Sequence, residues 1–171
     1  SHPVVPGSAL KGMLRQAARS HFEEADDGPT VTAVFGPPPG QANAHASAIR
    51  VSDARLLLLP VASEFGTIGW VTSPFVLKRV ARDFQWSIKV PDTVTDGRCQ
   101  LETESALMSQ GNQVELAGAE LDVEGFCNSL TAALSKLCVP SDPWWRSFLA
   151  KRICLVPDET FTLLSRTATD I

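Results

Sequence analysis

The chain has 171 residues, of which 44% are hydrophobic and 20% are charged, and its formal net charge is -4. This composition is typical of a globular protein of one ordinary domain and excludes a disordered tail. The net charge excludes a generally basic nucleic-acid protein, so any binding of RNA or DNA must depend on local clusters of cations.

The first predicted helix covers about residues 8–22 and follows an extended run that breaks at Pro6-Gly7. Its N-terminus presents unpaired N–H groups and the positive end of the helix dipole, and a glycine lets an anion approach the backbone. Cations recur every four residues along one face, at Lys11, Arg15 and Arg19, and we expect Lys11 to contact a phosphate. The apolar residues lie on another face, which we expect to pack on the core: Leu10, Met13, Leu14, Ala17, Ala18 and Phe22.

Two simpler interpretations of this helix remain open. Ser8 is a favoured residue for capping a helix on physical grounds alone. A stripe of cations is often no more than a solvated helix face. Residues 1–22 nevertheless hold three cations and no carboxylate.

Strands and a second helix are predicted in the next part of the chain. An acidic turn ends the first helix, and a loop runs from Pro37 to about His45. Residues 49–60 and 68–71 have the composition of strands. Ser73 is predicted to cap a helix that has Pro74 at its first position, where the missing N–H costs nothing. This helix carries further cations on its polar side: Lys78, Arg79 and Arg82.

Residues 87–123 are polar, acidic and contain glycine, and they predict an extended, hairpin-like insertion. We expect a helix over residues 122–137, a short strand over residues 152–156, and a last helix from Asp158 to about residue 168. Residues 91–124 hold eight carboxylates against the single cation Arg98, for which a solvated acidic face is the simpler interpretation. The irregular mixture of strands and helices predicts an α+β fold, with helices on one face of a largely antiparallel sheet.

Side chains that often serve chemistry have no recognisable partners in the sequence. Asp53 alone makes no set of metal ligands, and we expect it to cap a turn. Trp144 and Trp145 are predicted to give one core residue and one packing lid, with stacking on bases or on a partner as the alternative. The three histidines are in principle acid-base groups, but we expect them to be structural or exposed: His2, His21 and His45.

The four cysteines are too far apart for a metal-binding CxxC knuckle and too irregularly spaced for a disulfide framework. They predict reduced, mostly buried thiols in a cytoplasmic protein: Cys99, Cys127, Cys138 and Cys154. No apolar run approaches the length of a membrane span, so no membrane partner is expected. Hydrolysis of ATP or GTP is not expected either, because Lys11 precedes Gly12 and no P-loop pattern is present.

A series of short motifs runs through most of the chain. It begins with PGSALKG at residues 6–12, followed by Leu14-Arg15, and continues with VFG at 34–36, VSDARLL at 51–57 and LPV at 59–61. WVTSP at 70–74 and LVPD at 155–158, followed by Phe161, complete it. This series resembles the RAMP superfamily of CRISPR proteins, and within it the backbone subunit of the type III-B (Cmr) effector complex.

The resemblance implies an RRM-like, ferredoxin-like palm over residues 1–171 with an inserted β-thumb, for which residues 87–123 are the candidate. It also implies that the complete protein extends beyond this chain at both ends. The backbone of the guide RNA (crRNA) would be held at the glycine-rich corner. The RNA-binding residues implied by the resemblance and by the basic stripe are Gly7, Ser8, Lys11, Gly12, Arg15 and Arg19.

Partners and activity also follow from the resemblance. It implies self-association along the guide, contact with other Cmr-type subunits, and binding of a complementary target RNA. The complete backbone subunit is implied to be an endoribonuclease of antiviral defence, which uses a divalent metal, expected to be Mg²⁺, and an aspartate. In the family that aspartate lies upstream of the Pro-Gly corner, so no catalytic and no metal-binding residue is assigned here.

Two alternatives to this function remain. One is a non-catalytic scaffold subunit that binds guide RNA and its neighbours. The other is an α+β domain that binds a phosphorylated small molecule at the Gly7 corner.

Overall fold

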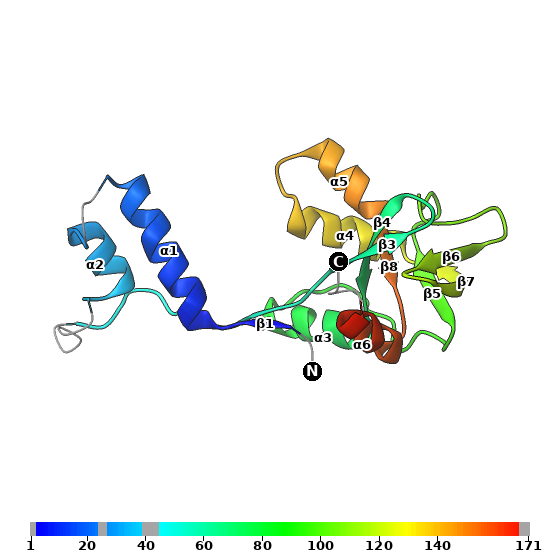
Figure 1. The fold of residues 1–171 in the computed structure, drawn as a ribbon, viewed down its shortest axis with the longest axis horizontal. Coiled ribbons are helices and arrows are strands. Elements are labelled where there is room, and N and C mark those ends of the chain that lie inside the picture. Colours follow the sequence, from blue (N-terminus) through cyan, green and yellow to red (C-terminus); the bar gives the residue numbers. More distant parts are fainter. Residues whose placement is uncertain (1–2, 24–26, 39–44, 168–171) are drawn as a thin grey trace. The chain divides into compact units, whose positions relative to one another are not determined.

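The chain divides into two compact units in the computed structural model, which describes residues 3–23, 27–38 and 45–167. The N-terminal unit comprises residues 3–55, and the C-terminal unit begins at Leu56. Each unit has its own secondary structure (Figure 1). The mixed α+β class is confirmed, whereas the RRM-like palm over residues 1–171 stays a prediction.

The N-terminal unit contains two short strands and two helices: β1 (Val4–Val5), α1 (Gly7–His21), α2 (Pro29–Phe35) and β2 (Ala54–Arg55). β1 and β2 pair antiparallel, with Val4 opposite Arg55. The predicted first helix is confirmed as α1. α2 was not predicted, although Gly28 at its N-cap and Pro29 at its first position are an ordinary start signal. Part of the predicted loop, residues 39–44, lies outside the described residues.

The apolar face of α1 is exposed, which corrects the expectation that it packs on a core. Met13 is 67% exposed, and Leu14 and Phe22 are each 49% exposed. Among the described residues of this unit, the buried large apolar side chains are Val31 and Phe35 of α2. It is the basic side of α1 that turns inward, because the Asp27 carboxylate and the Gly36 carbonyl of the same unit lie there as partners for its guanidinium groups.

A six-stranded mixed sheet forms the centre of the C-terminal unit, in the order β3-β4-β8-β5-β7-β6. Two of its five pairings are parallel, β4 with β8 and β5 with β7, so the sheet is less antiparallel than expected. The two outer strands approach each other, since Ala117 N–H donates to the carbonyl of Ala62. The strands are β3 (Leu59–Ser63), β4 (Thr67–Thr72), β5 (Arg98–Leu101), β6 (Gln113–Leu116), β7 (Ala119–Phe126) and β8 (Ile153–Leu155).

Four helices complete this unit: α3 (Pro74–Asp83), α4 (Asn128–Cys138), α5 (Pro143–Ala150) and α6 (Asp158–Thr167). Two hydrophobic clusters lie on opposite sides of β8, because alternate side chains of a strand point to opposite faces. Cys154 packs with Phe161 of α6, while Ile153 and Leu155 pack with side chains of α4 and α5. Helices therefore contribute to both clusters. None of the described helices is long and apolar enough to cross a membrane.

The predictions for the C-terminal unit hold in part. The helices that begin at Pro74 and Asp158 and the strands near residues 68–71 and 152–156 are confirmed. The helix predicted over residues 122–137 begins only at Asn128, because residues 119–126 form β7 between β5 and β6. Within residues 87–123, β6 and the start of β7 form the predicted hairpin. Its assignment as a thumb stays a prediction.

Candidate nucleic-acid interface

The first turn of α1 is capped by a carboxylate from the other end of the same unit. Gly7 N–H donates to Oδ1 of Asp53 over 2.8 Å, and the N-cap residue, Pro6, makes no side-chain bond. A negative charge at this position is stabilised by the unpaired N–H groups and the helix dipole. Asp53 is therefore the cap of α1 and not of a local turn, and the N–H of Gly7 has a protein partner.

The two glycines of the corner have different surroundings. A Cβ on Gly7 would lie 2.5 Å from the carbonyl oxygen of Val51, so glycine is needed there for the approach of the chain's own backbone. A Cβ on Gly12 would have nothing within 4 Å. Packing within the described chain does not require glycine at position 12, and the backbone there is open to an approaching molecule.

Lys11 carries a charge that no described carboxylate compensates. Its Nζ donates to Oγ of Ser47 over 2.9 Å, and that hydroxyl donates in turn to the carbonyl of Ile49. Both partners are neutral, and the side chain lies one turn from the start of α1. An ammonium group in this position is suited to contact a phosphate oxygen.

Arg15 and Arg19 are engaged in a different way. Both guanidinium groups bind the Asp27 carboxylate, at 2.9 Å from Arg15 and 2.6 Å from Arg19, and Arg15 also donates to the carbonyl of Gly36. The hydrogen bonds from Arg15, then from Arg19, hold the pKa of Asp27 below its usual range. Of the three cations of the basic stripe, Lys11 therefore has no described carboxylate partner. Arg15 and Arg19 both bind Asp27 and so connect α1 to the segment before α2.

The cations of α3 also have partners in the chain. Lys78 pairs with Asp92, and Arg82 pairs with the adjacent Asp83. Arg79 donates to the carbonyl of Leu56 over 2.7 Å. Ser8, the remaining residue of the predicted site, is exposed at the start of α1.

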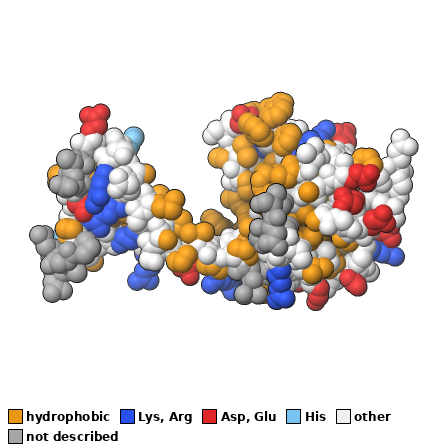
Figure 2. All heavy atoms as spheres, viewed as in Figure 1, with side chains coloured by type: hydrophobic (Ala, Val, Ile, Leu, Met, Phe, Trp, Pro, Cys, Tyr) orange, Lys and Arg blue, Asp and Glu red, His pale blue; other side chains and the backbone are white. Residues whose placement is uncertain are grey.

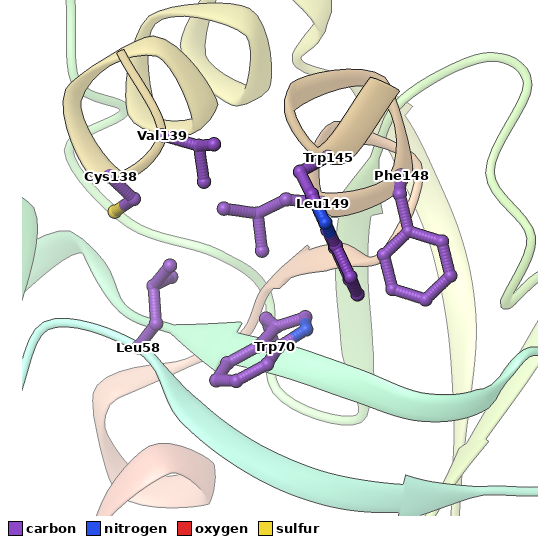
Figure 3. A pocket seen from close by; sticks show the side chains of 7 residues that line it. All are labelled: Leu58, Trp70, Cys138, Val139, Trp145, Phe148 and Leu149. Atoms are coloured by element: carbon purple, nitrogen blue, oxygen red, sulfur yellow. The ribbon is translucent and has the colours of Figure 1, made fainter. Parts of the chain in front are cut away.

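Trp144 and Trp145 do not form the predicted pair of one core residue and one lid. They are 63% and 52% exposed, because both lie in the first turn of α5, a helix that the sequence analysis did not predict. Trp145 borders an apolar pocket of about 320 Å³, which Figure 3 shows between α5, the end of α4 and β4. Its other lining residues are Leu58, Trp70, Cys138, Val139, Phe148 and Leu149.

The remaining candidates form no catalytic set among the described residues. His21 and His45 are exposed, and His2 lies outside the described residues. All four cysteines are free thiols, Cys99 and Cys154 are buried, and burial raises the pKa of Cys127 to about 12. No group of three His, Cys, Asp or Glu side chains in residues 3–23, 27–38 and 45–167 is placed to hold a metal ion.

Known proteins match this chain over most of its length. The family model of the RAMP superfamily matches residues 1–151. The chain is 30% identical to the CRISPR system Cmr endoribonuclease Cmr4 of Pyrococcus furiosus, an alignment that covers 99% of this chain and 57% of the relative. The chain thus spans little more than half the length of that curated relative.

Solved structures show the same fold along nearly the whole chain. Oligomeric Cmr4 from Pyrococcus furiosus superposes with a TM-score of 0.79 at 27% identity, over 99% of this chain and 64% of the other. A chain of the type III-B Cmr-beta complex bound to cognate target RNA gives a TM-score of 0.63 at 18% identity, over 97% of this chain and 57% of the other. The second likeness is one of fold alone.

Proposed function

Because this chain belongs to the RAMP superfamily, we propose that it is the guide-binding part of a backbone subunit of a type III-B CRISPR effector complex. The observation that carries this proposal is the likeness to the Cmr endoribonuclease over 99% of the chain. Oligomerisation of a protein with the same fold supports self-association along the guide. Other Cmr-type subunits and a complementary target RNA are the further partners.

Guide RNA is held through its phosphates at the start of α1. Lys11 supplies the charge, and the open backbone at Gly12 lets a strand approach the helix. Contacts of this kind position RNA without reading its sequence, and base pairing between guide and target supplies the specificity. Arg15 and Arg19 act indirectly, since their bonds to Asp27 fix the helix that carries Lys11.

In the complete protein, cleavage of the bound target RNA follows from the same proposal. A divalent metal would stabilise the charge that develops on the phosphate during hydrolysis. None of the described residues forms a group fitted to hold it, so we assign no catalytic role to this chain. The part of the chain described here holds and orients the RNA.

The test uses the full-length protein, assembled with guide RNA and its neighbouring subunits and incubated with labelled complementary RNA and Mg²⁺. We expect evenly spaced cleavage products that disappear when an aspartate upstream of the Pro6-Gly7 corner is replaced by alanine. A complex that neither retains guide RNA nor binds the labelled target would contradict the proposal.

A non-catalytic scaffold subunit is the second candidate, because the described residues include no catalytic group. It predicts tight target binding without cleavage products in the same assay. A domain that binds a phosphorylated small molecule is the third. It predicts a protein that purifies without RNA, whereas both subunit proposals predict copurifying RNA and a high absorbance at 260 nm.

A further inference from the structure

Three aromatic side chains of α5 lie together in the C-terminal unit, and two of them, Trp144 and Trp145, are exposed. Trp144 and Phe148 are stacked, with ring centroids 5.4 Å apart and planes inclined by 20°, and Trp145 meets both edge-on. The guanidinium of Arg152 lies 3.7 Å from the centre of the Phe148 ring. We call Trp144, Trp145, Phe148 and Arg152 the α5 aromatic surface. Figure 2 shows hydrophobic side chains gathered over this helix.

The outermost ring of the stack, the indole of Trp144, is largely exposed. Arg152 lies over the Phe148 ring, and Phe148 stacks on Trp144, so the order is cation, phenyl ring, indole. Trp144 ends this order and is 63% exposed. Stacked aromatic rings attract each other beyond the burial of their area, so a further flat ring on Trp144 would extend the stack.

Two cations near these rings lack a carboxylate partner among the described residues. Arg146 donates to the carbonyls of Val139 and Pro140, and Arg152 donates to those of Gly66 and Phe148. Residues 136–152 hold four cations against one carboxylate, a local charge of +3 in a chain of net charge -4. That carboxylate, Asp142, accepts the N–H groups of Trp144 and Trp145. Lys151 pairs with Glu104.

We infer that the α5 aromatic surface binds unpaired RNA bases, which stack on the exposed ring of Trp144 while the strand's phosphates lie near Arg146 and Arg152. Single-stranded nucleic acid is bound by this combination of exposed aromatic rings and positive charge. The inference goes beyond the proposed guide site, because it uses other residues, another unit of the chain and the bases instead of the phosphates.

The charges favour RNA over a protein as the ligand. An apolar side chain of a partner would fit the pocket beside Trp145, since all of its lining side chains are hydrophobic or aromatic. Such a side chain brings no negative charge to Arg146 and Arg152, whereas RNA carries a phosphate with every base. The flat ring of an RNA base also matches the face of the Trp144 indole in shape.

The test measures the affinity of the full-length protein for a fluorescein-labelled single-stranded oligoadenylate by fluorescence anisotropy, over a series of salt concentrations. Trp144→Ala should weaken binding about 5- to 100-fold, as expected for the loss of one stacked base. The slope of log K against log salt should stay the same, because stacking releases no counterions. Trp144→Phe should keep part of the affinity.

The matched control is Phe84→Ala, which removes another aromatic side chain that is 69% exposed and should leave the affinity unchanged. Lys11→Ala tests the guide site separately, because the loss of a phosphate contact should make log K depend less steeply on log salt. Wild-type affinity in Trp144→Ala would overturn the inference. Loss of self-association in sedimentation, with unchanged RNA affinity, would also overturn it and assign the surface to a second copy of the chain.

Discussion

Two helices of this chain are capped by carboxylates that come from remote positions in the sequence. Asp53 accepts the N–H of Gly7 at the start of α1, and Asp158 accepts the N–H of Phe75 in the first turn of α3. Ser73, which was expected to cap α3 by local spacing, makes no side-chain bond at the N-cap of this helix. A sequence pattern shows that a cap is needed but not which distant residue supplies it.

Replacing each of the two glycines of α1 by alanine should change the free energy of unfolding in opposite directions. Gly7→Ala should lower the free energy of unfolding by about 1–3 kcal/mol, because the new Cβ would lie 2.5 Å from a backbone oxygen. Gly12→Ala should raise it by about 0.5–1 kcal/mol, since the site is open and alanine favours the helix. Urea unfolding followed by circular dichroism measures both, and equal effects would contradict this distinction.

Gly12→Ala also tests the proposed guide site. If RNA approaches the backbone at this position, the variant should bind guide RNA more weakly even though it is more stable. A variant that is both more stable and fully competent for binding would remove Gly12 from the site.

The ion pairs of Asp27 with Arg15 and Arg19 should make the stability of the fold depend on pH. The pKa of Asp27 is lowered in the folded state, so its contribution is complete above the usual aspartate value of about 4 and is lost as the pH falls through the lowered value. Asp27→Asn should therefore melt at a lower temperature than the wild type at pH 7. The difference should close in acid, where both chains lack the charge, and thermal unfolding at a series of pH values measures it. A difference that does not vary with pH would show that the charge of Asp27 is not what holds Arg15 and Arg19.

At the scale of elements, periodicity predicted where α1 lies but not which of its faces is covered. The apolar face fits a core-facing helix, yet Met13 is 67% exposed and the polar side holds the contacts. A helical pattern separates the faces, but the covered face depends on what the rest of the molecule provides. Lys11 could be singled out from the sequence, whereas the Asp27 partner of Arg15 and Arg19 could not.

The helix α5 could have been predicted from the sequence. Asp142-Pro143 is the same kind of start signal as Ser73-Pro74, which was used correctly for α3. Because no helix was predicted over residues 143–150, Trp144 and Trp145 were expected to give one core residue and one lid. The aromatic surface was therefore missed.

Asp142 should stabilise α5, because its side chain caps the N-terminus of this helix. Its Oδ1 accepts the N–H groups of Trp144 at 2.9 Å and Trp145 at 3.0 Å. Asp142→Ala should lower the free energy of unfolding by about 1 kcal/mol, and Asp142→Asn should keep most of the stability, because an amide oxygen also caps. Urea unfolding followed by tryptophan fluorescence compares them. Equal losses in both variants would mean that the negative charge, and not the cap, is responsible.

At the scale of the whole molecule, the two sets of candidate contacts belong to different units. The proposed guide site belongs to residues 3–55, and the α5 aromatic surface belongs to the unit that begins at Leu56. The motifs that carry the resemblance to the superfamily are spread over both units, from residues 6–12 to residues 155–158. Family membership and the α+β class followed from the sequence. The sheet order did not, because β8 enters between β4 and β5 from far along the chain.

Binding of guide RNA by Lys11→Ala tests the proposed function most directly. The full-length variant should bind guides of different sequences about tenfold more weakly, with a smaller dependence on salt because one phosphate contact is lost. Lys78→Ala is the matched control, since Lys78 already pairs with Asp92, and it should bind as the wild type does. If Lys11→Ala binds guide RNA with wild-type affinity and wild-type salt dependence, the start of α1 does not hold the guide.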